Sequence, residues 1–304
     1  MVQDPSNVGA ANQLYTVLDY YVPGDTVSGA YTDCQKALAE QVFTRDDVVD
    51  WVKGDRIVHQ CKDWLNLLDA NGLNAKVPLV QLRRGEVLRI HGVNTLCVDR
   101  MKLFKQQGVI TKLCNSCYKV QILPTNLRDL IRLYFLFKIV ELPRDNSRKC
   151  MVELRERVPA PYKGYIFCES DEEARECQMI FERFVSGLGL SPFTCKITHG
   201  CSEFGLKYPS FKYSEDGSHH KFERPSDWYL KEAEFFLDNP RTNVIHREAI
   251  STDYITLREI LLLRNWVNYA NLIGDETGLA FGEPLAFDVP EVFAARVEPQ
   301  SAMR

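Results

Sequence analysis

The stretch from Cys117 to Cys201 constrains the fold more than any other, because its hydrophobic pattern predicts a complete series of strands and helices. Two of its alternating runs are separated by prolines, which have no N–H to donate to a strand ladder. Ser170 precedes three acidic residues, which is typical of a helix start. The predicted elements are a strand at 118–122, a helix at 127–140, strands at 149–155 and 163–169, a helix at 174–185 and a strand at 193–199.

This β-α-β-β-α-β order resembles the ferredoxin-like split motif. The resemblance implies the spatial strand order 4-1-3-2, in which the first strand lies between the fourth and the third. The start of strand one then lies beside the ends of strands three and four. Cys114 and Cys117 stand at the first of these points, Cys168 at the second, and His199 and Cys201 at the third. We therefore expect five potential metal ligands at one rim of the sheet.

A Cys-x-x-Cys pair with further Cys or His residues far downstream fits tetrahedral zinc, since two thiolates on a tight turn span adjacent corners. We expect Cys114, Cys117 and Cys201 to bind zinc, with Cys168 or His199 as the fourth ligand. Ordinary semi-buried thiols are one alternative, and thiol redox chemistry is another. A thioredoxin-like pair lies between a strand and the following helix, whereas this pair precedes a strand, which disfavours redox chemistry.

The face of the predicted sheet that points away from the helices is basic and aromatic. A period of two places these side chains on it: Lys119, Gln121, Lys163, Tyr165, Phe167, Lys196 and Thr198. The run Lys163-Gly164-Tyr165-Ile166-Phe167 resembles the start of the third-strand signature of RNA-recognition motifs. The resemblance implies that Tyr165 and Phe167 stack on bases. Packing of both rings against another part of the chain or a second subunit is the alternative.

Three short helices and a hairpin are predicted before residue 92. The first helix runs from residue 32 to 43, the second starts with a capping-box pattern at Thr44 and Asp47, and the third starts at Asp55 and ends at Asn71-Gly72. Two strands at 79–82 and 87–91 flank a turn. Over residues 32–91 this pattern, including the exit Ala70-Asn71-Gly72-Leu73, resembles winged helix-turn-helix domains.

The winged-helix resemblance implies DNA contacts by the third helix and the wing. The residues it would bring to DNA are Arg56, His59, Gln60 and Lys62 on the helix, and Arg83, Arg84 and Arg89 on the wing. Residues 80–112 hold seven basic residues, Lys102 and Lys105 among them, against two acidic ones, which favours phosphate contacts. The third helix also carries Asp55, Asp63 and Asp69, and such domains also dock proteins, so a protein partner is the alternative.

The composition of the sequence limits the classes of protein to which the chain can belong. A length of 304 residues with 45% hydrophobic and 26% charged residues predicts a soluble protein of about two domains. The net charge of −4 argues against a surface that binds nucleic acid everywhere. Ten cysteines without an N-terminal signal pattern favour a reducing, cytoplasmic location. No apolar run reaches the roughly 20 residues that cross a bilayer, so no membrane segment is expected.

The segment 254–273 is apolar on all sides, so we expect a helix buried against the N-terminal helices or a second copy of the chain. The open sheet face is the other possible oligomer contact.

No glycine-rich phosphate loop, Gly-x-Ser-x-Gly elbow or His-Glu-x-x-His pair occurs in the sequence.

The sequence thus predicts an α+β protein with three parts: a winged-helix-like domain (1–112), a ferredoxin-like domain (113–206) and a C-terminal helical extension (207–304). The predicted function is that of a non-catalytic, zinc-stabilised accessory protein that contacts nucleic acid or a partner protein. An enzyme with a catalytic metal or thiol at Cys114, Cys117 and Cys201 is the alternative.

Overall fold

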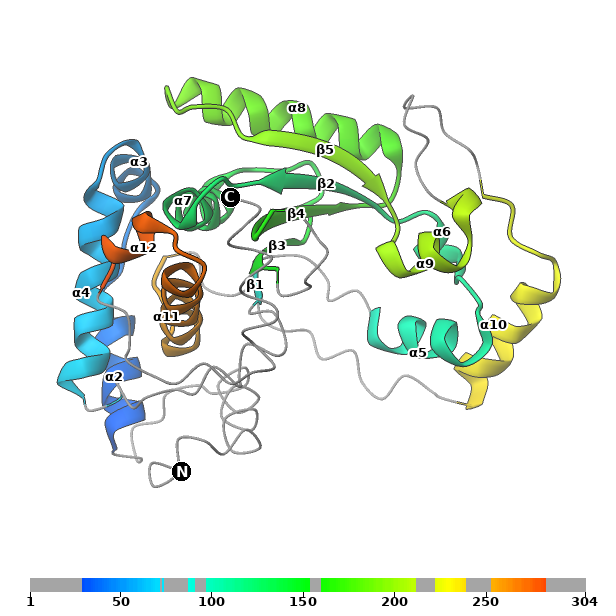
Figure 1. Cartoon of the computed structure of the whole chain (residues 1–304), viewed down its shortest axis with the longest axis horizontal. Helices are drawn as coiled ribbons and strands as arrows, with labels where there is room; N and C mark the ends of the chain where they lie inside the picture. The colour runs from blue at the N-terminus through cyan, green and yellow to red at the C-terminus, as the bar shows by residue number, and fades with distance from the viewer. Residues whose placement is uncertain are drawn as a thin grey trace.

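The computed structural model describes residues 29–71, 73, 87–90, 97–153, 160–211, 222–238 and 253–282, with the backbone alone at 87–90 and 98. These residues form a mixed α+β structure (Figure 1). The helices are α2 (Ala30–Ala39), α3 (Arg45–Lys53), α4 (Arg56–Ala70), α5 (Cys97–Gln107), α6 (Lys112–Asn115), α7 (Leu127–Ile139), α8 (Asp171–Gly187), α9 (Ser202–Lys207), the 3-10 helix η2 (Pro209–Phe211), α10 (Asp227–Asp238), α11 (Leu257–Leu272) and α12 (Glu276–Leu279). The strands are β1 (Val87–Ile90), β2 (Tyr118–Leu123), β3 (Arg148–Val152), β4 (Tyr162–Cys168) and β5 (Thr194–His199).

The five strands form one antiparallel sheet in the order β1-β3-β4-β2-β5. Tyr118, at the start of β2, pairs with Cys168 on one side and His199 on the other. The start of β2 therefore lies beside the ends of β4 and β5, as the strand order expected from the sequence requires. β1 adds a fifth strand on the outside of β3. The expected hairpin partner of β1, at 79–82, lies outside the described residues.

Helices α7 and α8 cover one face of the sheet, α7 over β3 and β4 and α8 over β2, β4 and β5. Their shared core includes Phe137 of α7 and Phe181 of α8, whose ring centroids lie 5.8 Å apart. A Cβ atom at Gly164 of β4 would collide with Leu133 of α7. The backbone of β4 thus lies directly beneath α7, and only glycine leaves room for this contact.

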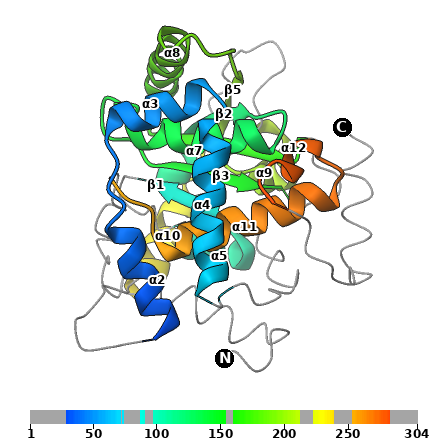
Figure 2. The same ribbon diagram turned by 90° about the vertical axis from the view of Figure 1, so that its left-hand side faces the viewer.

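The N-terminal helices pack on the outside of α7, at the end of the molecule seen in Figure 2. Thr44 and Asp47 form the expected capping box at the start of α3. The apolar stripe of α4 is buried, and its Trp64 ring stacks on Phe135 of α7 with centroids 5.7 Å apart. One hydrophobic core therefore continues from α2, α3 and α4 through α7 to the sheet.

Helix α11 begins three residues later than the sequence pattern suggested. The carbonyl of Asp253 accepts a hydrogen bond from Phe43 N at 2.7 Å, and the helix is instead started by a capping box between Thr256 and Glu259. Every residue from Glu259 to Ala270 is buried. The helix contacts α2, α4, α7 and α12 of its own chain. The expected contact of this helix with a second copy is therefore wrong, because its surface is covered within the chain.

A second, smaller core lies at the opposite end of the sheet from α2, α3 and α4 (Figure 1). Helices α5, α6, α9, α10 and η2 surround it, and we call them the small helical layer. Phe104 of α5 and Phe204 of α9 pack edge to face at its centre, with centroids 4.7 Å apart. Its buried side chains are Leu103, Phe104, Val109, Ile110, Phe204, Phe211, Trp228 and Phe235.

Candidate metal centre

Cys114, Cys117 and Cys201, which we call the thiol cluster, lie where the small helical layer joins the sheet. Thr111 caps the single turn of α6 by accepting a hydrogen bond from Cys114 N at 3.3 Å, and Cys117 N donates to Cys114 O at 3.3 Å. Gly200 N donates to Cys117 O at 2.7 Å, which ties the end of β5 to the start of β2. The pair expected from the Cys-x-x-Cys motif is therefore next to the segment that carries Cys201.

Gly200 makes this junction possible. Its φ of +56° lies in the left-handed region, and a Cβ atom there would collide with the ring of Phe211. The turn directs the chain out of β5 so that Cys201 stands at the start of α9.

The thiols of the cluster are largely shielded from water and lie within electrostatic range of one another. Burial raises the pKa of Cys114 to about 11 and that of Cys117 to about 12, and it also raises the pKa of Cys201. Negative charge on Cys201 adds to the increase in pKa at both Cys114 and Cys117. Negative charge on Cys97, the first residue of α5, acts in the same direction on the pKa of all three.

A cation lies beside the cluster. Lys119 Nζ is 3.9 Å from Cys201 Sγ, and its charge lowers the pKa of Cys117 and Cys201, against the larger effect of burial. Lys119 lies on β2 and points to the face of the sheet that α7 and α8 do not cover, and Cys117 directly precedes the strand.

The expected fourth ligand, Cys168 or His199, stays a prediction. Both residues are cross-strand partners of Tyr118, at the start of β2. A hydrogen bond with Cys177 of α8 and burial raise the pKa of the Cys168 thiol, and negative charge on Cys117 adds to this increase in pKa.

The ring of His199 has a separate structural position. It is stacked between the rings of Tyr118 and Phe211, with centroids 4.6 and 4.3 Å away. His199 Nε2 lies 2.6 Å from Asn115 O, so this ring supports the turn between Cys114 and Cys117.

No group of three Cys, His, Asp or Glu side chains within the described ranges is arranged to hold a metal ion. The thiols thus neighbour one another without forming a coordination shell. None of the ten cysteines forms a disulfide. Three thiolates are a common donor set for zinc. Because their pKa values are raised, these thiols are protonated at neutral pH, and a bound zinc ion would displace the protons.

The aromatic pair expected on the sheet lies beside this cluster. Tyr165 and Phe167 are half-buried neighbours on β4, with ring centroids 6.3 Å apart. Lys149 Nζ lies 4.9 Å from the Tyr165 centroid and 5.6 Å from that of Phe167, and Lys119 Nζ lies 5.8 Å from that of Tyr165. The sequence interpretation missed Lys149, although the register that pairs it with Tyr165 follows from aligning the two alternating runs.

Lys163 was expected on the same face, but the structure places it in the interior. Its side chain and that of Glu153 are 3% and 2% exposed, and Lys163 Nζ lies 2.8 Å from Glu153 Oε2. A buried ion pair of this kind neutralises the charge within the fold, so Lys163 presents no cation to a partner.

The other expected binding residues are dispersed. Lys102 and Lys105 are exposed on α5, and Lys102 Nζ lies 5.8 Å from the Phe235 ring centroid. Arg83 and Arg84 lie outside the described residues, and Arg89 is described by its backbone in β1 alone. On α4, Arg56, His59 and Lys62 are exposed and Gln60 is partly buried, with Arg56 paired to Asp50 of α3.

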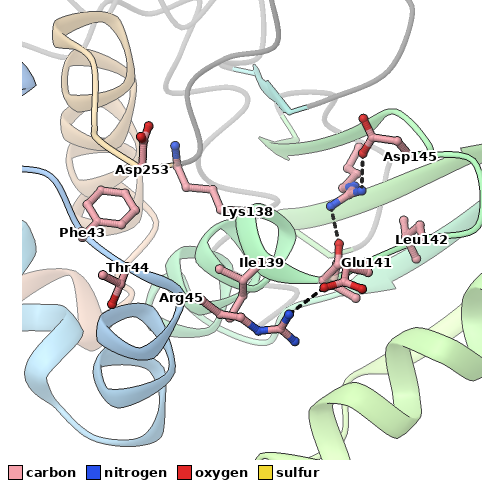
Figure 3. Close-up of a pocket in the computed structure, with 11 residues that line it drawn as sticks. Phe43, Thr44, Arg45, Lys138, Ile139, Glu141, Leu142, Asp145 and Asp253 are labelled. Carbon is pink, nitrogen blue, oxygen red and sulfur yellow. Dashed lines mark hydrogen bonds and ion pairs between the residues drawn. The ribbon is translucent and has the colours of Figure 1, made fainter.

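A pocket of about 530 Å³ opens between the start of α3 and the end of α7 (Figure 3). Its charged side chains bind one another or the backbone: Arg45 pairs with Glu141 at 2.8 Å, and Arg148 pairs with Asp145 at 2.9 Å and donates to the carbonyl of Val140 at 2.7 Å. These pairs connect the end of α7 to its neighbours, so we assign the pocket a structural role.

Comparison of the chain with protein-family models, with characterised proteins and with solved structures found no match. None of the helices within the described ranges is long and apolar enough to cross a membrane. The geometry of the thiol cluster and of the adjacent sheet face is therefore the basis for assigning a function.

Proposed function

We propose that this is a non-catalytic binding protein in which the thiol cluster holds a structural zinc ion and the adjacent sheet face contacts single-stranded nucleic acid. The observation that carries the zinc proposal is the convergence of Cys114, Cys117 and Cys201, separated by up to 87 residues in sequence, at one junction. Zinc bound by thiolates requires reduced cysteines, so the proposal includes a reducing compartment such as the cytoplasm.

A zinc ion bound at the thiol cluster would stabilise the small helical layer. Its core holds eight buried side chains, and helices α6 and α9 have only 4 and 6 residues. Small cores of this kind commonly need a metal or disulfides as an additional constraint. Cys114 and Cys201 pack against this core, so a metal bound there would join α6 and α9 to the start of β2.

A catalytic thiol is the less favoured alternative. Nucleophilic cysteines have a lowered pKa, whereas burial raises the pKa of all three thiols in the cluster. A catalytic metal would need an open coordination position for water. The number of thiolates bound to the metal determines whether such a position is left.

Metal analysis of the purified full-length protein tests the zinc proposal. We expect about one zinc per chain, lost in Cys114→Ser and in Cys201→Ser. Cys195→Ser is the matched control, because Cys195 is also half-buried but lies on the helix side of β5. Retention of stoichiometric zinc in both cluster variants would refute the ligand set.

The nucleic-acid proposal depends on Tyr165 and Phe167 together with Lys119 and Lys149. Stacking of bases on exposed rings, flanked by cations that contact phosphates, is how many proteins bind single strands. Lys119 lies beside both Cys201 and Tyr165, which places the aromatic pair next to the proposed metal. A protein partner that uses the same rings is the alternative.

Fluorescence anisotropy with labelled single-stranded RNA and DNA of mixed sequence, over a series of salt concentrations, tests this proposal. Stacking contributes about 1–3 kcal/mol per base, so the double variant Tyr165→Ala/Phe167→Ala is expected to weaken binding roughly tenfold or more. Tyr229→Ala on α10 removes an exposed aromatic far from the sheet face and is expected to bind as the parent does. Absence of binding by the parent at low salt would end the nucleic-acid proposal and leave the zinc proposal standing.

We also propose a more specific assignment of the fold, to two known types of domain. The order β3-β4-β2-β5 with α7 and α8 on one face supports a ferredoxin-like domain. The succession α2, α3, α4 and the capping box of α3 support a winged-helix-like arrangement. The exposed side of α4 mixes Arg56 and Lys62 with Asp63 and Asp69, which favours docking of a protein over contact with DNA.

A further inference from the structure

The two aromatic rings of the sheet face already carry a cation. Lys149 stands directly opposite Tyr165 in the register of β3 and β4, and one pair further along Phe167 N donates a hydrogen bond to Ser147 O at 2.9 Å. Side chains that are opposite or diagonal across two antiparallel strands are close enough to interact. The amine of Lys149 accordingly reaches both rings, 4.9 Å from the Tyr165 centroid and 5.6 Å from that of Phe167.

The ammonium of Lys149 lies over the middle of the aromatic pair. The two centroids are 6.3 Å apart, and a group at similar distances from both stands between them. Lys119 reaches Tyr165 from β2 at 5.8 Å and also lies 3.9 Å from Cys201 Sγ, so it stands at the rim of the pair. A base that stacks on Tyr165 or Phe167 must therefore displace the ammonium of Lys149.

Displacing this ammonium is more costly for some ligands than for others. An uncharged aromatic group, such as the side chain of a partner protein, breaks two cation–π contacts and offers the amine no anion in return. A nucleotide brings a phosphate, which accepts a charge-assisted hydrogen bond from an ammonium. Because one amine contacts both rings, a single phosphate between two bases compensates for the loss of both contacts.

We propose that Lys149 makes stacking at this site depend on a phosphate, and this proposal rests on the proposed nucleic-acid function. Two adjacent nucleotides bind, one base on each ring, and Lys149 leaves the rings to bind the phosphate that joins them. Lys163, two residues before Tyr165 on β4, cannot supply this charge because it is held in its buried pair with Glu153.

The spacing of the two rings selects an unstacked single strand. Successive nucleotides of a helical strand rise by about 3.4 Å. The centroids of Tyr165 and Phe167 are 6.3 Å apart, so two neighbouring nucleotides must be drawn apart to place one base on each ring. The ligand class is therefore a flexible strand with a charged linkage, in preference to a duplex or an uncharged aromatic surface.

Competition against the labelled single strand in fluorescence anisotropy, with the full-length protein, tests this proposal. One competitor is a dinucleoside monophosphate of thymidine, and the other is the same compound with an uncharged methylphosphonate linkage. The parent is expected to bind the phosphodiester about tenfold more tightly, the size of one hydrogen bond to a charged group. Lys149→Met, which removes the amine, is expected to bind the phosphodiester more weakly than the parent does and the uncharged compound more tightly. This opposite change in the two affinities distinguishes the proposed role from general damage to the fold, which would weaken both.

Two further variants separate the charge of Lys149 from other effects. Lys149→Arg keeps a cation and is expected to retain the preference for the phosphodiester. Lys196→Met removes an exposed cation of β5 on the same face of the sheet and is expected to keep the preference of the parent.

The possible outcomes separate this proposal from the nucleic-acid function. Equal affinity of the parent for the two compounds, or a preference that persists in Lys149→Met, would overturn the role of Lys149 and leave the nucleic-acid function in place. Failure of the phosphodiester to compete with a bound strand would do the same. A parent that binds neither the strand nor the competitors would overturn the function and the role of Lys149 together.

Discussion

The buried ion pair between Lys138 and Glu259 is expected to dominate the stability of the contact between α7 and α11. Lys138 Nζ lies 2.9 Å from Glu259 Oε1, and the two side chains are 0% and 2% exposed. Tyr134 donates its hydroxyl hydrogen to the same oxygen, and Thr256 N donates to the other oxygen at 2.6 Å. Glu259 therefore combines a buried charge pair with the capping box of α11.

Substitution Glu259→Gln removes the charge and turns one acceptor into a donor. Removing one partner of a buried pair costs about 3–5 kcal/mol, because the other charge stays buried without compensation. For a chain of this size, about 2–4 °C per kcal/mol corresponds to a decrease in Tm of roughly 6 °C or more. The same substitution at Glu141, whose side chain is 87% exposed in its pair with Arg45, is expected to change stability by less than about 1 kcal/mol.

Urea unfolding followed by tryptophan fluorescence measures both effects, since Trp64 and Trp266 are buried in the same core. The double variant Lys138→Met/Glu259→Gln provides a second check. With neither charge left in the interior, it is expected to be more stable than the sum of the two single losses predicts. Equal stability of Glu259→Gln and Glu141→Gln, or strict additivity in the double variant, would refute this account of the pair.

Three further predictions concern stability. Glu153→Gln leaves Lys163 buried without its counter-charge and is expected to cost about 3–5 kcal/mol in urea unfolding; a loss below about 1 kcal/mol would contradict the pairing. Gly200→Ala forces a side chain into the left-handed region and onto Phe211, so proteolysis is expected to cleave α9 and η2 faster than in the parent, and an unchanged rate would count against the tight turn. Burial and the Glu153 carboxylate raise the pKa of Tyr269, so its contribution to stability is complete below the unfolded pKa of about 10 and is lost as the pH rises from there through the raised folded pKa. Unfolding between pH 9 and pH 11 is therefore expected to depend less on pH in Tyr269→Phe, and an equal dependence in both proteins would exclude this contribution.

Local patterns in the sequence predicted the strands β2 to β5 and their order, but the strand at 87–91 was expected in the wing of a separate domain, whereas β1 pairs with β3 of the same sheet. Alternation along 118–122 and 163–169 marks strands, and the pairing of Tyr118 with both Cys168 and His199 is the one that the order 4-1-3-2 requires. The capping box at Thr44 was also predictable, because its hydrogen bonds span only three residues. The start of α11 was placed too early, since Thr252-Asp253 and Thr256 both resemble helix caps and the tertiary bond from Phe43 to Asp253 decides between them.

The thiol cluster shows what local sequence patterns cannot predict. The strand order predicted that the start of β2 lies beside the ends of β4 and β5, and it does. A ligand must also point toward the metal, and the direction of each side chain depends on the turns that flank the strands. The packing of α5 on α9 could not be recognised in this way, because the contact between Phe104 and Phe204 joins residues 100 positions apart. No local spacing encodes such a contact.

Lys119 connects the two proposed activities physically. Its ammonium lies beside Cys201 and also 5.8 Å from the ring of Tyr165, so one side chain is shared by the thiol cluster and the aromatic pair. Without a metal the thiols are protonated and neutral, and Lys119 has no thiolate charge to attract it. With zinc bound by the three thiolates of the cluster, a net charge of −1 would hold the ammonium at the rim, next to the ring on which a base would stack. A metal with a purely structural role would in this way fix the position of a cation on the binding face.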